Sequence, residues 1–280
     1  MTRLLVCGIA VMDYVHRVDV LPMTEGKHRS TSFDRIGGGC AANAAVGAAR
    51  LGAHVTLMAR LGMDTTGDEL AAMLAGRGIE TALTRGGRTP LSSILIDGRG
   101  ERMIVNFPGA NLPTDPPPVP NTDVVLSDCR WPEAAEAVLH AAKTNGIPSV
   151  LDGEKYTPAP LAALADHVVF SAPGLRDFSG IDQLDKALAD ASVRLPGHVA
   201  VTDGPDGVRW GDGLHVPAPR ITPVDTLGAG DLWHGAFALA LGQGRDRVAA
   251  SRFANAAAAL KCTRAGGWDH YPTLHELETA

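Results

Sequence analysis

Two glycines and a carboxylate lie together in the stretch 224–231, which reads VDTLGAGD. An apolar run with helical spacing follows, so we expect a helix to begin near Asp231. Gly228 and Gly230 lack a Cβ, so the backbone can turn several N–H groups toward one point, where the helix adds the positive end of its dipole. This arrangement suits phosphoryl transfer, in which N–H groups bind the phosphate and a carboxylate accepts a hydroxyl proton. The alternative is an ordinary helix N-terminus with an Asp cap.

A second glycine cluster, residues 37–39, precedes an alanine-rich run that we expect to form a helix over 41–51. Glycines before a helix let a ligand approach the backbone closely, and the N–H groups at the helix start can bind polar oxygens. A hinge leading into a tightly packed alanine helix would have the same pattern. The cluster therefore indicates a second candidate binding element.

Composition narrows the functional classes. The 280 residues carry a net charge of −6 and show no basic stripe, so we expect neither nucleic acid nor a membrane as a partner. The start of the chain does not read as a signal peptide, and no apolar run reaches membrane-spanning length. Four scattered cysteines without a C-x-x-C pair favour reduced thiols, so we expect a cytoplasmic protein.

Short apolar runs alternate with helical patterns along most of the chain. Runs such as 4–9, 54–58, 149–151 and 198–202 read as buried strands, with helices expected between several of them. This alternation predicts an α/β domain whose mostly parallel sheet carries helices on both faces.

Some segments break the alternation and read as mixed-face strands. They include 92–96 and 102–107, which flank an Asp-Gly turn typical of a hairpin. We expect them to form a small β-sheet lid built from about 12–36 and 88–108, within a single domain over 1–280. The proline-rich segment 111–121 would be a stiff connector back to the main sheet.

The motifs also carry a family resemblance. The stretch 225–231 resembles the D-T-x-G-A-G-D signature of the ribokinase-like (PfkB) sugar kinases, and 38–45, 49–52 and 62–67 resemble that family's N-terminal signatures G-G-x-x-x-N-x-A, A-x-L-G and G-x-D-x-x-G. The resemblance implies a ribokinase-like three-layer α/β/α domain with a central, mostly parallel sheet and a small β-sheet lid. In this family the lid often forms a homodimer contact, so a homodimer is expected.

The resemblance also implies roles for individual residues. The transfer centre would have Asp231 as general base, with the γ-phosphate held by Gly228, Ala229 and Gly230. The sugar would be bound by Asp13, Gly38, Gly39 and Asn43. The nucleotide would be bound by Thr202, Gly204, Gly207 and Asn255. A monovalent cation such as K⁺ would be bound near Asp225 and Leu227.

ATP and Mg²⁺ are the cofactors that this resemblance implies. Many family members carry N-x-x-E at a strand end, where it helps to position magnesium. The matching place here, 171–174, reads SAPG and has neither residue. We therefore expect Mg²⁺ to be held mainly by ATP phosphates and waters, and we assign no ligand from the chain.

A subgroup resemblance concerns the sugar. The surroundings of Lys27, Asn106 and Arg130 resemble the bacterial 6-deoxy-6-sulfofructose kinases, which phosphorylate O1 of a ketose sulfonate in sulfoquinovose degradation. A sulfonate is a permanent anion, and an ammonium, an amide and a guanidinium could bind its three oxygens. Arg130 also follows a predicted strand end, where α/β sheets bind ligands.

Each of these candidates has a simpler explanation. Lys27 could be a solvated lid residue, Asn106 could cap a turn, and Arg130 could pair with Asp128 or Asp152. Asp13 could be a turn carboxylate, and Asn43 could bond to backbone at the helix start. A family kinase for fructose, fructose 6-phosphate, another sugar or a nucleoside remains an alternative, as does a non-catalytic sensor.

Overall fold

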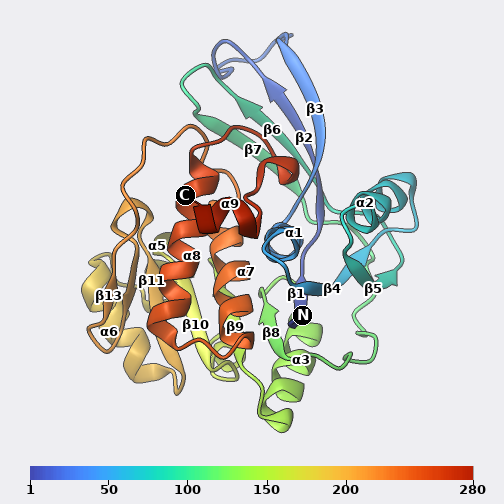
Figure 1. The fold of residues 1–280 in the computed structure, drawn as a ribbon. Coiled ribbons are helices and arrows are strands. Elements are labelled where there is room, and N and C mark those ends of the chain that lie inside the picture. Colours follow the sequence, from blue (N-terminus) through green and yellow to red (C-terminus); the bar gives the residue numbers. More distant parts are fainter. Residues whose placement is uncertain (280) are drawn as a thin grey trace.

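The computed structural model describes residues 1–279 and contains a nine-stranded sheet and a separate four-stranded sheet (Figure 1). The order of the large sheet is β13-β12-β11-β10-β9-β8-β1-β4-β5. Its strands are β1 (Arg3–Gly8), β4 (His54–Leu61), β5 (Glu80–Arg85), β8 (Val124–Ser127), β9 (Ser149–Gly153), β10 (His167–Ser171), β11 (His198–Thr202), β12 (Val208–Trp210) and β13 (His215–Val216). All pairs are parallel except β11–β12 and β12–β13. The predicted α/β fold with a mostly parallel sheet is confirmed.

Alternate side chains of the strands belong to two separate hydrophobic cores, one on each face of the sheet. In β1, Leu4 and Val6 belong to one core, whereas Leu5 and Cys7 belong to the other. The first face is covered by α1 (Cys40–Arg50), α2 (Thr65–Ala75), α7 (Ala229–Gly242) and α8 (Arg247–Cys262). The second is covered by α3 (Pro132–Asn145), α4 (Ala159–Ala162), α5 (Ala172–Ser179) and α6 (Leu184–Arg194). The domain thus has three layers, helix, sheet and helix.

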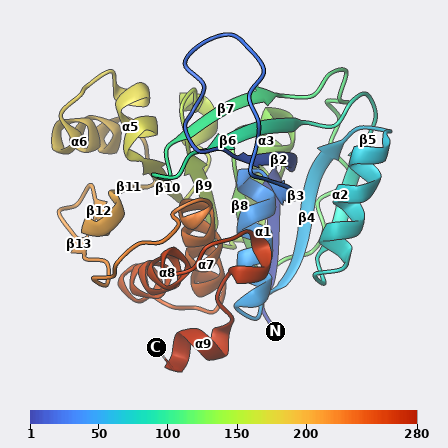
Figure 2. The ribbon, with the colours of Figure 1, turned by 90° about the horizontal axis from the view of Figure 1, so that it is seen from above.

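The small sheet stands at one end of the large one (Figure 1), and Figure 2 looks down on the molecule from that end. Its order is β3-β2-β6-β7, formed by β2 (Val11–Arg17), β3 (Ser32–Gly38), β6 (Leu91–Ile96) and β7 (Arg102–Phe107). Asp97 fixes the β6–β7 turn, because its carboxylate accepts hydrogen bonds from the N–H groups of Arg99 and Glu101. We call this sheet the lid. Only two residues separate its first strand from the end of β1, so it is attached directly at the carboxyl edge of the large sheet.

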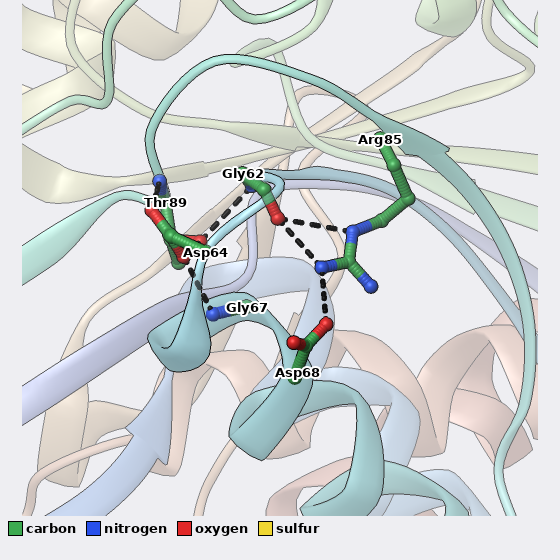
Figure 3. A network of polar contacts seen from close by, with 6 residues as sticks. All are labelled: Gly62, Asp64, Gly67, Asp68, Arg85 and Thr89. Atoms are coloured by element: carbon green, nitrogen blue, oxygen red, sulfur yellow. Dashed lines mark hydrogen bonds and ion pairs between the residues drawn. The ribbon is translucent and has the colours of Figure 1, made fainter.

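A polar network anchors the base of the lid to α2 (Figure 3). Asp64 accepts hydrogen bonds from the N–H of Gly67 and from both the N–H and the hydroxyl of Thr89, at 2.6 to 2.8 Å. The Arg85 guanidinium donates to the Gly62 carbonyl oxygen. The G-x-D-x-x-G loop therefore caps α2 and holds the segment that enters β6.

None of the helices in residues 1–279 is long and apolar enough to cross a lipid bilayer. Two short segments complete the described chain on the α8 side, a 3₁₀ turn (Trp268–His270) and α9 (Leu274–Thr279). The 3₁₀ turn contributes Trp268 to the first core.

The α1–α7 contact depends on a glycine. A Cβ placed on Gly235 would lie 2.4 Å from the Ala44 carbonyl oxygen. The two helices can therefore approach this closely only because α7 has no side chain at that position.

We expect Gly235→Ala to lower the free energy of unfolding by about 1–2 kcal/mol, since overpacking against backbone outweighs alanine's higher helix propensity. Urea unfolding measures this. Gly98→Ala is the control, because a Cβ there would lie 3.8 Å from its nearest neighbour, the Asp19 carbonyl oxygen. Equal stability of the two variants would contradict the packing argument.

Candidate active site at the N-terminus of α7

Two cavities lie on either side of the N-terminus of α7. The first, of about 600 Å³, lies beneath the lid, and we call it the lid cavity. Its lining includes Asp13, Asn43, Asn106, Arg130 and Asp231. The second, of about 410 Å³, lies between α7, α8 and the β11–β12 region, and we call it the helix cavity. Its lining includes Thr202, Gly204, Gly207, Ala229, Gly230 and Asn255. Most residues predicted for the two substrates therefore separate into two adjoining cavities.

The turn between the cavities presents free N–H groups. Gly228 caps α7 with φ of 73°, and a Cβ there would also lie 2.2 Å from the Tyr271 hydroxyl. The N–H groups of Gly228, Gly230 and Asp231 have no acceptor within residues 1–279. The Ala229 N–H instead donates to the Thr226 carbonyl oxygen at 3.2 Å, so this member of the predicted phosphate turn is already partly satisfied. Three free N–H groups at a helix start form an anion site.

Asp231 is held in place by α1. Asn43 Nδ2 donates to Asp231 Oδ2 at 2.7 Å, and Asn43 Oδ1 accepts from Trp268 Nε1 at 2.7 Å. The indole has only a donor to offer, so it fixes which end of the Asn43 amide faces the carboxylate. Burial raises the pKa of Asp231, while the hydrogen bond from Asn43 and the charge of His234 oppose that shift.

His234 lies one turn further along α7 and is almost fully buried. Its Nδ1 faces the Gly230 carbonyl oxygen at 2.8 Å, and its Nε2 faces the Val169 carbonyl oxygen at 3.1 Å. Carbonyl oxygens only accept, so both contacts are satisfied when the ring is protonated. Asp152 Oδ1, at 3.5 Å from Nε2, is the nearest carboxylate oxygen to this ring. His234 therefore connects the turn, through Gly230, to strand β10, through Val169.

Asp13 enters the lid cavity from strand β2 rather than from a turn. A Cβ on Gly38 would lie 2.1 Å from Asp13 Oδ2, so this glycine leaves the room that the carboxylate occupies. Burial raises the pKa of Asp13 to about 6, against a hydrogen bond from Ser92, and the Asp231 charge adds to the rise. Gly39, at the start of α1, lines the same cavity.

Two guanidinium groups line the lid cavity, and only one of them was predicted. Within residues 1–279 the Arg130 side chain has no carboxylate at ion-pair distance, and only its backbone N–H bonds to Asp128, at 2.8 Å. Arg60 lies over the Trp131 ring, 5.1 Å from its centroid, and donates to the carbonyl oxygens of Arg130 and Pro113. Arg60 is the last residue but one of strand β4, which continues past the predicted 54–58 to Leu61. A longer strand prediction would have put Arg60 at the ligand-binding edge.

The other two residues predicted for the anion differ in outcome. Asn106 lies in β7, not in a turn, and its Nδ2 donates to Ser92 Oγ at 3.2 Å at the cavity wall. Lys27 is exposed in the loop between β2 and β3 and does not line the cavity. The predicted contact of Lys27 with the anion is therefore not formed in this structure, in which Lys27 lies on an exposed loop.

In the helix cavity, the predicted residues Gly207 and Asn255 form part of the wall. Gly207, with φ of 86°, leaves no space for a Cβ, which would lie 2.3 Å from the Val216 carbonyl oxygen. Asn255 is 3% exposed, and its amide is already bonded to Trp233 Nε1 and to the Val216 carbonyl oxygen. We therefore assign Asn255 to the cavity wall rather than to direct hydrogen bonding with a ligand.

No magnesium ligand is assigned from the described residues. No carboxylate lines the helix cavity in residues 1–279. Cys40, Asp152 and Asp231 have potential ligand atoms within 4.8 Å of one another, but burial raises the pKa of all three and a thiol does not suit Mg²⁺. At the place predicted for a monovalent cation, the Lys261 ammonium donates to the Asp225 carbonyl oxygen.

Comparison with known proteins agrees with this geometry. The profile of the pfkB family carbohydrate kinases matches residues 1–274. A Bacillus subtilis ribokinase is 31% identical, with 99% of each chain covered. A provisionally named ribokinase from Agrobacterium tumefaciens has a crystal structure with a TM-score of 0.92 at 37% identity, covering 99% of this chain and 96% of that one. The structure of Arabidopsis thaliana ribokinase with ribose and ATP is 25% identical, with a TM-score of 0.85 and coverage of 99% and 98%.

We expect the Asp13 carboxyl group to titrate with a midpoint near pH 6, because burial disfavours its charged form. Asp13 would then be a charged acceptor at neutral pH and would lose that charge as the pH falls through about 6. Carboxyl ¹³C NMR measures this, and Asp13→Asn assigns the resonance by removing it. A midpoint near the ordinary value of about 4 would contradict the burial argument.

Proposed function

Because the chain belongs to the pfkB family of carbohydrate kinases and is an ATP-dependent sugar kinase, we propose that it phosphorylates O1 of 6-deoxy-6-sulfofructose. This would be a step in the degradation of sulfoquinovose. The observation that carries the proposal is the pair of guanidinium groups, Arg60 and Arg130, in the same cavity as Asp231. A neutral sugar needs no such charge, whereas a sulfonate needs fixed donors.

In this proposal Asp231 accepts the proton of the attacking hydroxyl. Its carboxylate borders the lid cavity, while Ala229 and Gly230 of the same turn line the helix cavity. A sugar hydroxyl on one side would face the terminal phosphate of ATP on the other. The free N–H groups of Gly228, Gly230 and Asp231 would take up charge on the transferring phosphoryl group. Mg²⁺, held by ATP phosphates and waters, would neutralise further phosphate charge.

The sugar would be oriented by groups around the lid cavity. Asp13 and Asn43 offer acceptor and donor atoms near Asp231, Gly38 leaves the room that the Asp13 carboxylate occupies, and Gly39 lines the cavity beside them. The sulfonate would lie toward Arg60, Arg130 and Asn106. Arg60 is held in advance by two carbonyl oxygens and the Trp131 ring, so little side-chain entropy would be lost on binding.

The lid would cover the sugar and exclude water, which limits hydrolysis of ATP. Its surface carries exposed apolar side chains at Phe33, Ile104 and Val105. Since such residues favour association, we propose that two copies pair through their lids. Lys27, on the exposed lid loop, would then lie near the partner rather than in its own cavity.

A neutral sugar is the second candidate. The relatives above are named ribokinases, which favours a pentose substrate. Yet a Halopiger xanaduensis relative at 30% identity, covering 95% of this chain and 94% of its own, is named an ATP-dependent ribose-1-phosphate kinase. Family membership is therefore compatible with a charged sugar. A coupled ADP-release screen over sulfofructose, fructose 6-phosphate, fructose, ribose and adenosine separates the candidates.

Replacing the proposed base should stop chemistry and spare binding. We expect Asp231→Asn to lower kcat by about 10²–10⁴-fold, the range typical of general-base removal. The affinity for ATP, measured by calorimetry, should change little. Asp182→Asn, at an exposed position, is the control. Near-normal turnover of Asp231→Asn would exclude Asp231 as the base.

Removing the unpaired guanidinium should change substrate preference. We expect Arg130→Met to lower kcat/KM for sulfofructose by about 10²-fold, equivalent to losing one charge-assisted contact, and to affect fructose much less. Arg252→Met, an exposed arginine on α8, controls for lost surface charge. An equal loss on both sugars would contradict the role of Arg130 in binding a sulfonate.

A further inference from the structure

A buried lysine lies beside the loop that precedes the phosphate-binding turn. Lys261 is in the last turn of α8 and has no exposed surface. Its Nζ donates to the Asp225 carbonyl oxygen at 3.0 Å and lies 3.7 Å from Asp225 Oδ2. A buried ammonium is costly unless it is paired, so this position needs an explanation beyond packing.

Asp225 links three parts of the chain around this ammonium. Its carboxylate accepts from the Leu227 N–H at 2.9 Å and from the Gly266 N–H at 3.4 Å. Its own N–H and that of Val224 donate to the Cys262 carbonyl oxygen. The loop entering Gly228 is thereby held against the end of α8. A change in the charge near Asp225 would therefore affect the phosphate-binding turn, which begins three residues later at Gly228.

The Asp225 carboxylate already has positive side chains on both sides. The Asp225 carboxylate has the Lys261 ammonium on one side, and the Arg102 guanidinium of the lid at 3.9 Å from Oδ1 on the other. Arg102 also donates to the Thr226 hydroxyl at 3.0 Å. Two positive groups thus face one carboxylate. A third cation in the same place would meet net repulsion in a poorly solvated site.

We propose that Lys261 is a built-in cation, which takes the place that a monovalent metal ion would otherwise fill at Asp225 and Leu227. The predicted K⁺ site is replaced in this chain by its own ammonium group. The kinase then needs no K⁺. This inference rests on the ATP-dependent kinase activity alone and does not depend on which sugar is the substrate.

The first test uses the wild-type protein. Turnover with its best sugar, at constant ionic strength, should be equal in potassium chloride and in choline chloride. Thermal unfolding should show no stabilisation specific to K⁺. Activation by K⁺ of about tenfold or more, or a K⁺-specific rise in Tm, would overturn the proposal.

The second test asks whether added K⁺ can replace the Lys261 ammonium group. Lys261→Met keeps an unbranched apolar stem and removes the charge, so the variant should lose about tenfold or more of its turnover in choline chloride and recover it in potassium chloride. Its Tm should also rise with K⁺. Lys143→Met, an exposed lysine on α3, should behave as the wild type does in both salts.

The outcomes separate this proposal from the sugar assignment. A Lys261→Met variant that keeps full turnover without K⁺ would overturn the role of the ammonium. If the variant does not fold, the wild-type comparison of the two salts still decides. A failure to use sulfofructose would leave both salt comparisons intact, because they are made with whichever sugar is turned over.

Discussion

The hydrogen bond between Asn43 and Asp231 is the contact on which the site depends. It joins side chains 188 positions apart in sequence, on α1 and α7, at 2.7 Å. Close packing of the two helices makes it possible, since Gly235 lies against Ala44 and Gly47 lies against Leu232. The result is a carboxylate held at the boundary between two cavities, beside free N–H groups. A sugar kinase needs this geometry, because both substrates must meet at one point while water is kept out.

Electrostatic balance explains why so many acids can lie close together here. Burial raises the pKa of Asp13, Asp152 and Asp231, and these groups repel one another when ionised. The charge of His234 opposes the rise in the pKa of Asp231, and of the two cavity arginines Arg130 opposes the rise in the pKa of Asp152. The same arginines and the free N–H groups are the features that would bind anionic substrates. One set of charges therefore stabilises the site and attracts its ligands.

The sequence allowed the fold and the centre of the site to be predicted, because both depend on local patterns. Alternating apolar runs predicted the parallel sheet, and the lid strands 92–96 and 102–107 agree closely with β6 and β7. Residues that matter through tertiary contacts were not predictable in this way. Arg60 was not predicted because the strand that carries it was expected to end at residue 58. Lys261 was not predicted because no local sequence pattern indicates that an ammonium group is buried. Lys27 was expected in the cavity, but a long loop carries it into solvent.

A crystal structure with the sugar substrate and a non-hydrolysable ATP analogue would test the central claim most directly. We predict a sugar hydroxyl within hydrogen-bonding distance of the Asp231 carboxylate, and the terminal phosphate on the N–H groups of Gly228, Gly230 and Asp231. A carboxylate turned away from the sugar, or a phosphate bound elsewhere, would contradict the account.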